Sequence, residues 1–309
     1  MGNSKVTVYI SIVMTMIFWG FTFVAFKLAY ESFEPISIIF FRLLVANIFL
    51  FGFAFAFKKL NRIKRKDLKW FILMALLEPC LYFLGEAFGL TLVSSTVGAV
   101  IISTIPLFVP YAAFLVFKER LTPMNIVGLI ISFGGVLLVL LVNSGEVHAS
   151  PKGILLMFVA VFSAVGYTMI AKKLTENYNP LSITAYQGLG IILFIPFFLI
   201  IDLPDLNFSA VTSISIYSVL YLGLFGSGIC FILLTFAMRE IGAAKANIFG
   251  NLIPVVTAIL SFYILKEPMP FLKVIGIAIV IVGLLMSQLG EVLNRRAERK
   301  NGFKHSTYA

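Results

Sequence analysis

The fold is decided by two matching apolar stretches, SSTVGAVIISTIPLFVPYAAFLVFKE at residues 94–119 and GAAKANIFGNLIPVVTAILSFYILKE at residues 242–267. Each stretch has a proline near its middle, Pro106 or Pro254, and each ends in a Lys-Glu pair. A helix of about 20 apolar residues is long enough to cross about 30 Å of hydrocarbon. The two stretches therefore predict a related pair of membrane-spanning helices.

The rest of the chain has the same apolar character. Of its 309 residues, 60% are hydrophobic and only 12% are charged, and the mean hydropathy is +1.03. A soluble domain has roughly a quarter charged residues, so this composition excludes a soluble enzyme and a nucleic-acid-binding domain. Apolar runs that can span a bilayer lie at residues 8–28, 36–57, 70–90, 94–117, 123–142, 153–173, 181–201, 214–238, 243–265 and 271–289.

These runs are expected to be helices. Backbone amides in hydrocarbon must be bonded within the protein, which leaves only helices and closed barrels as spanning structures. None of the runs alternates polar and apolar residues as a barrel strand does. The predicted fold class is therefore an all-α polytopic membrane protein with ten transmembrane helices.

The net charge of +10 predicts how the chain is oriented in the membrane. Lysines and arginines gather in alternate loops and in the tail: Lys58, Lys59, Arg62, Lys64, Arg65, Lys66, Lys69, Lys118, Arg120, Lys172, Lys173, Arg239, Arg295, Arg296, Arg299, Lys300 and Lys304. Basic loops stay on the cytoplasmic side. We expect an integral protein of the cytoplasmic membrane with both termini in the cytoplasm.

The two halves of the chain repeat each other. At an offset of 148 residues, Pro106 matches Pro254, Lys118-Glu119 matches Lys266-Glu267, Gly128 matches Gly276 and Gly135 matches Gly283; at 145, Pro35 matches Pro180, Phe41 matches Tyr186 and Arg42 matches Gln187. An odd number of helices in each half places the second copy upside down, which is typical of transporters. We predict two inverted five-helix repeats, residues 1–147 and 148–290, and a basic cytoplasmic tail, residues 291–309.

The ordered motifs resemble those of the drug/metabolite transporter superfamily, and within it the EamA-type ten-helix transporters. The resemblance covers essentially the whole chain and rests on Trp19-Gly20 with Phe23 and Lys27, Pro35 with Phe41-Arg42, Ser95 through Pro106 to Lys118-Glu119, and the echo ending at Lys266-Glu267. It implies a ten-helix basket whose central cavity is lined mainly by helices one, three, four, six, eight and nine, with helices five and ten outside. It also implies export of small metabolites, often amino acids. The second half departs from the pattern because Ser163-Ala164 replaces Trp-Gly and Gln187 replaces the arginine.

The third apolar run carries the first candidate site. Ionisable groups in hydrocarbon are costly, so each is a functional candidate. Glu78, Tyr82 and Glu86 follow an i, i+4, i+8 row that would face a cavity, and Pro79 is expected to bend the helix there. Glu78, near the midplane, is interpreted as a carboxylate that binds a proton or a cation; a protonated acid bonded within the bundle is the alternative.

Arg42 and Trp19 each have two interpretations. Arg42 is predicted at the same depth as Glu86, which favours a structural ion pair, although an arginine there can also bind a substrate carboxylate. Trp19 lies in mid-helix and either stacks on a substrate or packs against neighbouring helices. Lys27, near the outer end of its helix and one turn from Glu31, is interpreted as a lysine that extends to the interface.

The remaining candidates belong mostly to the second half. Asn247 and Asn251, one turn apart, either bind substrate or join helices, and Tyr167 and Gln187 are further polar candidates. Pro79, Pro106, Pro110 and Pro254 are candidate kinks, which serve as flexing points or shape the cavity. Cys80 and Cys230 lie in apolar runs with no histidine or second cysteine nearby, so we expect no disulfide, metal or cofactor.

These features favour a secondary active transporter that exports amino acids or similar small metabolites by alternating access. The sequence has no Walker A motif, so an ion gradient is the expected energy source, with protons exchanged at Glu78. The expected partners are a small-molecule substrate, protons and the lipid bilayer, and the oligomeric state stays open. Efflux of cationic drugs is the alternative. A channel or a lipid-modifying intramembrane enzyme is disfavoured, since His148 and His305, the only histidines, lie outside the apolar runs.

Overall fold

The computed structural model describes residues 5–117, 123–141, 150–241, 243–283 and 285–286, and within these ranges it contains helices and turns but no strand. The first half has α1 (Lys5–Tyr30), α2 (Pro35–Ala56), α3 (Leu68–Ala75), α4 (Tyr82–Leu92), α5 (Ser95–Ile102), α6 (Ile105–Phe117) and α7 (Pro123–Leu141). The second half has α8 (Pro151–Leu174), α9 (Pro180–Gly188), α10 (Ile195–Phe197), α11 (Ser213–Tyr221), α12 (Cys230–Ile241), α13 (Ala243–Ile248), α14 (Leu252–Ile264) and a last helix, Phe271–Gly283. The predicted all-α membrane fold is confirmed.

Six helical segments are long and apolar enough to cross a membrane: Val6–Tyr30, Pro35–Ala56, Arg65–Leu92, Pro151–Leu174, Pro180–Asp205 and Ser213–Ile241. Four shorter apolar helices accompany them: Ser95–Val109, Ile126–Val139, Leu252–Ile264 and Phe271–Gly283. They occupy the positions of the ten predicted spans, but among the described residues only the six longer segments meet both the length and the composition of a full crossing. The count of ten therefore stays a prediction.

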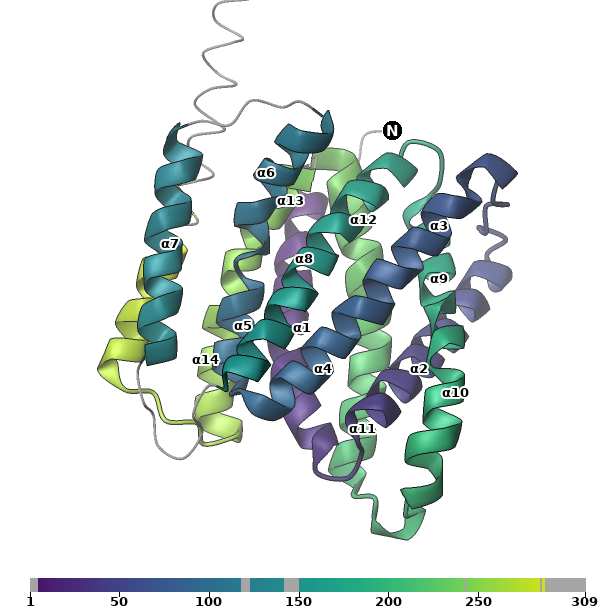
Figure 1. The fold of residues 1–309 in the computed structure, drawn as a ribbon. Coiled ribbons are helices and arrows are strands. Elements are labelled where there is room, and N and C mark those ends of the chain that lie inside the picture. The colour runs from purple at the N-terminus through teal and green to yellow at the C-terminus, as the bar shows by residue number, and fades with distance from the viewer. Residues whose placement is uncertain (1–4, 118–122, 142–149, 242, 284, 287–309) are drawn as a thin grey trace, which may run out of the picture.

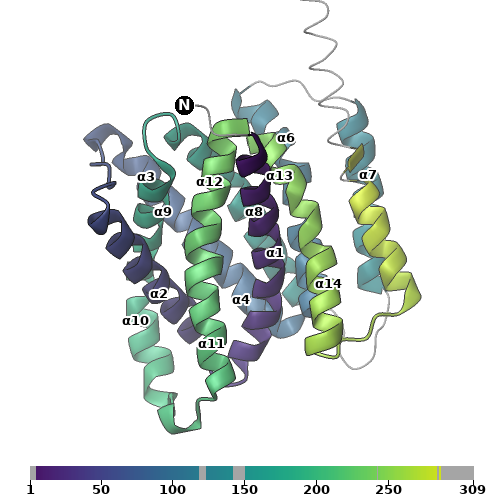
Figure 2. The ribbon, with the colours of Figure 1, turned by 180° about the vertical axis from the view of Figure 1, so that it is seen from behind.

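The helices run up and down between two ends of one bundle, with α1 in its middle (Figure 1). Seen from behind, α1 lies between α12 and α14, and it contacts both (Figure 2). Helices α7 and 271–283 lie side by side at one edge in both views, and α2, α9 and α10 lie at the other. This arrangement places α1 where side chains of both halves can meet.

Small residues allow α4 and α8 to pack closely. A Cβ atom added to Gly85 would lie 2.5 Å from the Leu156 carbonyl oxygen, and one added to Gly89 would lie 2.7 Å from Met157 Sδ. Only glycine leaves room for backbones at this distance. Close contacts between α4 and α8 are therefore present at both glycines.

Several helices that the sequence predicts as continuous are interrupted. The third span has a π-helical segment, Leu76–Leu81, in which Glu78 has an extended backbone (φ −140°, ψ 113°). The eighth has another, Leu222–Ile229. The regular i, i+4, i+8 row expected through Glu78, Tyr82 and Glu86 is therefore wrong at Glu78, because a residue before proline is driven out of the helical region.

The prolines lie close to these interruptions. Pro79 belongs to the first π-helical segment, and Pro106 is the second residue of α6, just after the break between α5 and α6. Pro254 lies in the first turn of α14, after the 3-10 turn Phe249–Asn251. Proline fits the first turn of a helix because no helical partner is lost there. Helix α6 continues through Pro110.

Contacts between α7 and the last helix relate the two halves by pseudo-symmetry. A Cβ atom on Gly135 would lie 2.8 Å from the Gly276 oxygen and 2.6 Å from the Val280 nitrogen. A Cβ atom on Gly283 would lie 2.7 Å from the Gly128 oxygen and 2.5 Å from the Ser132 nitrogen. Gly283 is the repeat counterpart of Gly135, 148 residues later, and Gly128 and Ser132 are the counterparts of Gly276 and Val280. The same contacts therefore occur twice, with the roles of the two helices exchanged.

A second exchanged pair fixes the starts of α2 and α9. The Ser37 backbone N–H and hydroxyl each donate to Asp202 Oδ2 at 2.7 Å, and Asp202 closes the seventh span. Ser182, 145 residues after Ser37, accepts at 2.7 Å from the backbone N–H of Asn61, just beyond α2. Each half thus holds a helix start of the other half.

Candidate functional site

A cavity of about 80 Å³ lies in the middle of the bundle, between the two halves. Its walls come from α1, the third span, α5 and α6 in the first half, and from α8, α12, α13 and α14 in the second. These are the six predicted spans that the family resemblance implies, and Arg42 of α2 is added to them. The cavity brings together eight of the candidate residues: Trp19, Arg42, Glu78, Tyr82, Glu86, Pro106, Tyr167 and Asn247.

The other candidates lie elsewhere. Gln187 and Pro79 line a neighbouring pocket of about 10 Å³, which shares the walls Phe83 and Phe231 with the main cavity. Pro254 is buried in α14 but is not part of the cavity wall. The side chains of Asn251 and Pro110 lie outside the described residues.

Arg42 forms the ion pair that its depth predicts. Its Nη1 donates to Glu86 Oε2 at 3.0 Å, and both side chains are buried. Its Nε donates to Ser227 Oγ at 2.9 Å, and the guanidinium lies 3.9 Å from the centre of the Phe83 ring. The arginine thus joins α2 to α4 and to the eighth span, and its charge is compensated within the protein.

Both carboxylate oxygens of Glu86 have partners. Oε2 accepts from Arg42, and Oε1 accepts from the Tyr82 hydroxyl at 3.1 Å. Helix α4 is regular here, so Tyr82 and Glu86 stand one turn apart on the same face. This half of the predicted acidic row is therefore a closed network and offers no free charge.

Glu78 is different. It is 2% exposed, its carboxyl group lines the cavity, and its Oε1 has no hydrogen-bond partner among the described residues. The position 148 residues further on is Gly226, so the second half supplies no matching acid. A buried acceptor without a partner is costly unless a proton, water or ligand satisfies it.

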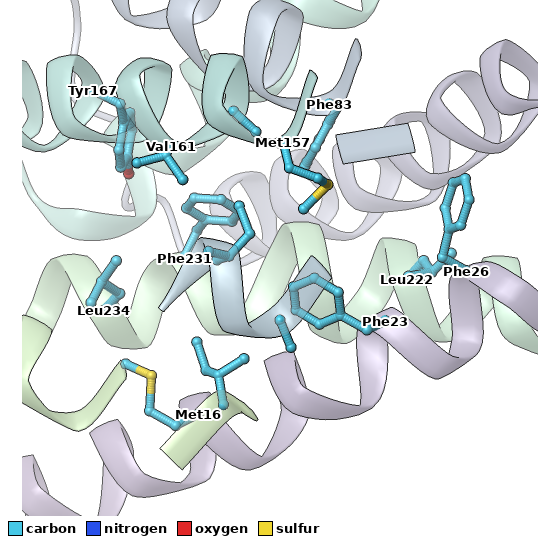
Figure 3. Close-up of a cluster of buried hydrophobic side chains, with 14 of the residues drawn as sticks. Met16, Phe23, Phe26, Phe83, Met157, Val161, Tyr167, Leu222, Phe231 and Leu234 are labelled. Atoms are coloured by element: carbon cyan, nitrogen blue, oxygen red, sulfur yellow. The ribbon is translucent and has the colours of Figure 1, made fainter. Parts of the chain in front are cut away.

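Aromatic rings cover another part of the cavity wall. Trp19 Nε1 donates to the Gly226 carbonyl at 3.0 Å, and its ring meets Phe231 edge-on with centroids 5.3 Å apart. Tyr167 also meets Phe231 edge-on, at 5.8 Å, and its hydroxyl is buried without a partner. Figure 3 shows Phe231 between Tyr167 and the apolar side chains Met16 and Phe23 of α1. Packing is therefore one role of Trp19, and its ring still faces the cavity.

Charged groups also fix the outer end of the site. Lys27 Nζ donates to the Leu90 carbonyl and, at 2.8 Å, to the Val93 carbonyl. Lys27 thus binds carbonyls at the C-terminal end of α4, which are acceptors that the sequence did not predict. Glu267 accepts from the Ser95 N–H at 2.8 Å at the start of α5. Its counterpart in the repeat, Lys118-Glu119, lies outside the described residues.

Sequence reasoning missed several residues of this site, and two of them bind Arg42. Ser227 binds Arg42, and Phe83 covers the guanidinium. Ser227 could have been found only by placing the eighth span against α2. Phe83 is one of 32 phenylalanines, so nothing in the sequence distinguished it.

A helical bundle with a central cavity between pseudo-symmetric halves is typical of membrane transporters. The sequence profile of the EamA-like transporter family matches residues 6–141 and again residues 151–289. The chain belongs to this family, and it is an integral membrane protein of the transporter class.

Individual relatives agree with the family. An uncharacterized transporter of Archaeoglobus fulgidus is 31% identical over 89% of this chain and 96% of its own. The uncharacterized transporter YetK of Bacillus subtilis is 27% identical over 90% of this chain and 86% of its own. A solved crystal structure covers 92% of this chain and 98% of its own with a TM-score of 0.70, and at 14% identity it shows the fold alone.

Proposed function

We propose that this chain is a secondary active transporter that exports small metabolites carrying an amino group, amino acids among them, across the cytoplasmic membrane. The observation that carries the proposal is the buried carboxyl of Glu78, which lines the central cavity and whose Oε1 has no hydrogen-bond partner among the described residues. A carboxylate in hydrocarbon attracts a cation or a proton. The substrate's amino group would be that cation.

Alternating access would come from the two halves, residues 1–147 and 148–290, rocking about the cavity with both termini in the cytoplasm. Support comes from the exchanged glycine contacts of α7 and the last helix, and from the family profile, which matches once in each half. In a transporter with inverted repeats, contacts that close the cavity on one side of the membrane can be replaced by the repeat-related contacts on the other side. The interruptions beside Pro79, Pro106 and Pro254 are the proposed flexing points.

Glu78 would couple substrate to protons by competition. One carboxylate can hold a proton or pair with an ammonium group, and binding of either excludes the other. Export of one substrate cation would thus be exchanged for entry of one proton. Arg42 and Glu86 keep each other neutral, so Glu78 is the group left to change its charge during the cycle.

Efflux of cationic drugs is the second candidate function. It uses the same carboxylate and is favoured by the aromatic wall of Trp19, Tyr167 and Phe231, because aromatic faces attract organic cations. Export of metabolites and efflux of drugs differ in the size of the substrate rather than in the chemistry of the site.

Transport by the purified protein in liposomes tests the proposal. Charge movement is recorded after concentration jumps of amino acids, amines and cationic dyes at two pH values, and labelled substrate is followed in parallel to detect electroneutral exchange. We expect saturable, pH-dependent transport that Glu78→Gln makes independent of pH. The control is Glu176→Gln, the same change at an exposed residue. A wild-type pH profile in Glu78→Gln would remove the coupling role, and flux that never saturates would indicate a channel.

A further inference from the structure

We infer that the cavity selects amines and other organic monocations over the amino acids that carry the same side chain. The inference rests on the proposed function and narrows its substrate class. It follows from the balance of hydrogen-bond donors and acceptors on the cavity wall. A zwitterion needs donors for its carboxylate, whereas an amine needs only acceptors.

Most donors on the wall are already used inside the protein. Four of them bind backbone carbonyls, namely Trp19 Nε1 to Gly226 at 3.0 Å, Thr22 Oγ1 to Trp19 at 2.6 Å, Ser103 Oγ to Val100 at 2.7 Å and Thr168 Oγ1 to Ala164 at 2.8 Å. One amide N–H of Asn247 is likewise given to the Ala243 carbonyl, at 2.9 Å. A ligand carboxylate that enters the cavity therefore finds these groups occupied.

Arg42, the one cation among the described residues of the wall, is already paired. Nη1 binds Glu86, Nε binds Ser227, and the face of the guanidinium covers Phe83. Nη2 lies beside Gly226, where an added Cβ would be 3.3 Å away. The positive charge of Arg42 is already balanced by Glu86, so a ligand carboxylate at Arg42 would compete with a buried ion pair, which is costly.

Acceptors, in contrast, are available. Glu78 Oε1 is buried at the cavity without a partner, and the buried Tyr167 hydroxyl, which can accept as well as donate, faces the same cavity. The hydroxyl oxygens of Thr22, Ser103 and Thr168 each keep lone pairs after donating their protons. An ammonium group carries three donors and a positive charge, so it satisfies several of these atoms at once.

The remainder of the wall fits an apolar body. Met16, Phe23, Ile102, Leu234 and Ile253 line it beside the aromatic rings. An ammonium group at Glu78 would place the rest of a small amine against these side chains, where burial is favourable. The site thus matches a compact amine with an aromatic or branched aliphatic body and no carboxylate.

The test compares matched pairs of ligands on the purified full-length protein. Binding of phenethylamine is measured against phenylalanine, and 3-methylbutylamine against leucine, by calorimetry in detergent. Phenylalanine methyl ester, which keeps the amino group but has no negative charge, separates charge from size. Transport of the same compounds is then measured in liposomes.

We expect each amine to bind at least about 10-fold more tightly than its amino acid, with the ester close to the amine, because one unpaired charge costs this much or more. Glu78→Gln should weaken binding of the amines by about 10-fold to 100-fold, and Glu176→Gln should not. Tyr167→Phe, which removes one hydroxyl group, should weaken binding of the amines less than Glu78→Gln does. It provides the test if Glu78→Gln does not fold.

Two results would count against the inference. Equal or tighter binding of phenylalanine and leucine would overturn the choice of amines while leaving export of metabolites with an amino group intact. Tight binding of amines that is unchanged in both Glu78→Gln and Tyr167→Phe would overturn the assigned site. Failure of every compound with an amino group, in binding and in transport, would instead overturn the proposed function itself.

Discussion

Two π-helical segments occupy matching positions in the halves of this transporter, and they differ in chemistry. Leu76–Leu81 carries Glu78, whereas Leu222–Ile229 carries Gly226 at the position 148 residues later. The first points an acid into the cavity. The second presents a backbone carbonyl to Trp19 and a bare Cα to Arg42. The repeat has kept the irregular backbone in both halves and the charge in only one.

The difference shows how one cavity can be symmetric in shape and asymmetric in binding. π-helical segments recur at functional sites because they free backbone groups and redirect side chains. In the first half the redirected group is a carboxyl, and in the second it is the carbonyl that fixes Trp19. The second segment therefore supports the aromatic wall of the same cavity that the acid of the first segment lines.

Of the changes that test this comparison, loss of Arg42 should have the largest effect. Arg42 binds Glu86, which follows the first π-helical segment, and Ser227, which lies in the second. Arg42→Met leaves Glu86 buried without its cation, and we expect a loss of about 3–5 kcal/mol of stability. Thermal unfolding in detergent measures it. The double variant Arg42→Met/Glu86→Met should recover much of the loss, and no recovery would show that Arg42 acts mainly through Ser227 or Phe83.

A side chain at Gly226 should have the next largest effect. A Cβ atom there would lie 2.9 Å from Thr22 Cγ2 and 3.3 Å from Arg42 Nη2, so Gly226→Ala is expected to cost about 1–3 kcal/mol through overpacking. Gly52→Ala is the matched control, because nothing lies within 4 Å of its Cβ. That variant should be neutral or stabilising by about 0.5–1 kcal/mol. Equal unfolding temperatures for the two variants would contradict the close contact.

The smallest expected effect is that of the Trp19 N–H group. Trp19→Phe keeps an aromatic ring but leaves the Gly226 carbonyl without its donor, which should cost about 1 kcal/mol of stability. Trp70→Phe, at the other tryptophan of the chain, is the control, and each single variant leaves one tryptophan as a fluorescent reporter. A loss of stability in Trp70→Phe as large as that in Trp19→Phe would show that the Trp19 hydrogen bond makes no special contribution to stability.

The sequence predicted the parts of this structure that depend on composition and spacing. Apolar runs located the helices, and the depth of Arg42 and Glu86 predicted their ion pair. It did not predict contacts between distant segments, such as Trp19 with Gly226 or Ser37 with Asp202, since nothing local in the chain specifies them. The acceptors of Lys27 could not be predicted for the same reason, because they lie at the end of α4, more than 60 residues away.

The glycine contacts between α7 and the last helix have a consequence for how such a chain is assembled. Gly135 meets Gly276, and Gly283 meets Gly128, so each surface is the repeat-related copy of the surface that it touches. This is the geometry of an isologous dimer interface, in which one patch serves both partners. Each half therefore carries a self-complementary edge, and a half made as a separate chain is expected to pair with a second copy of itself.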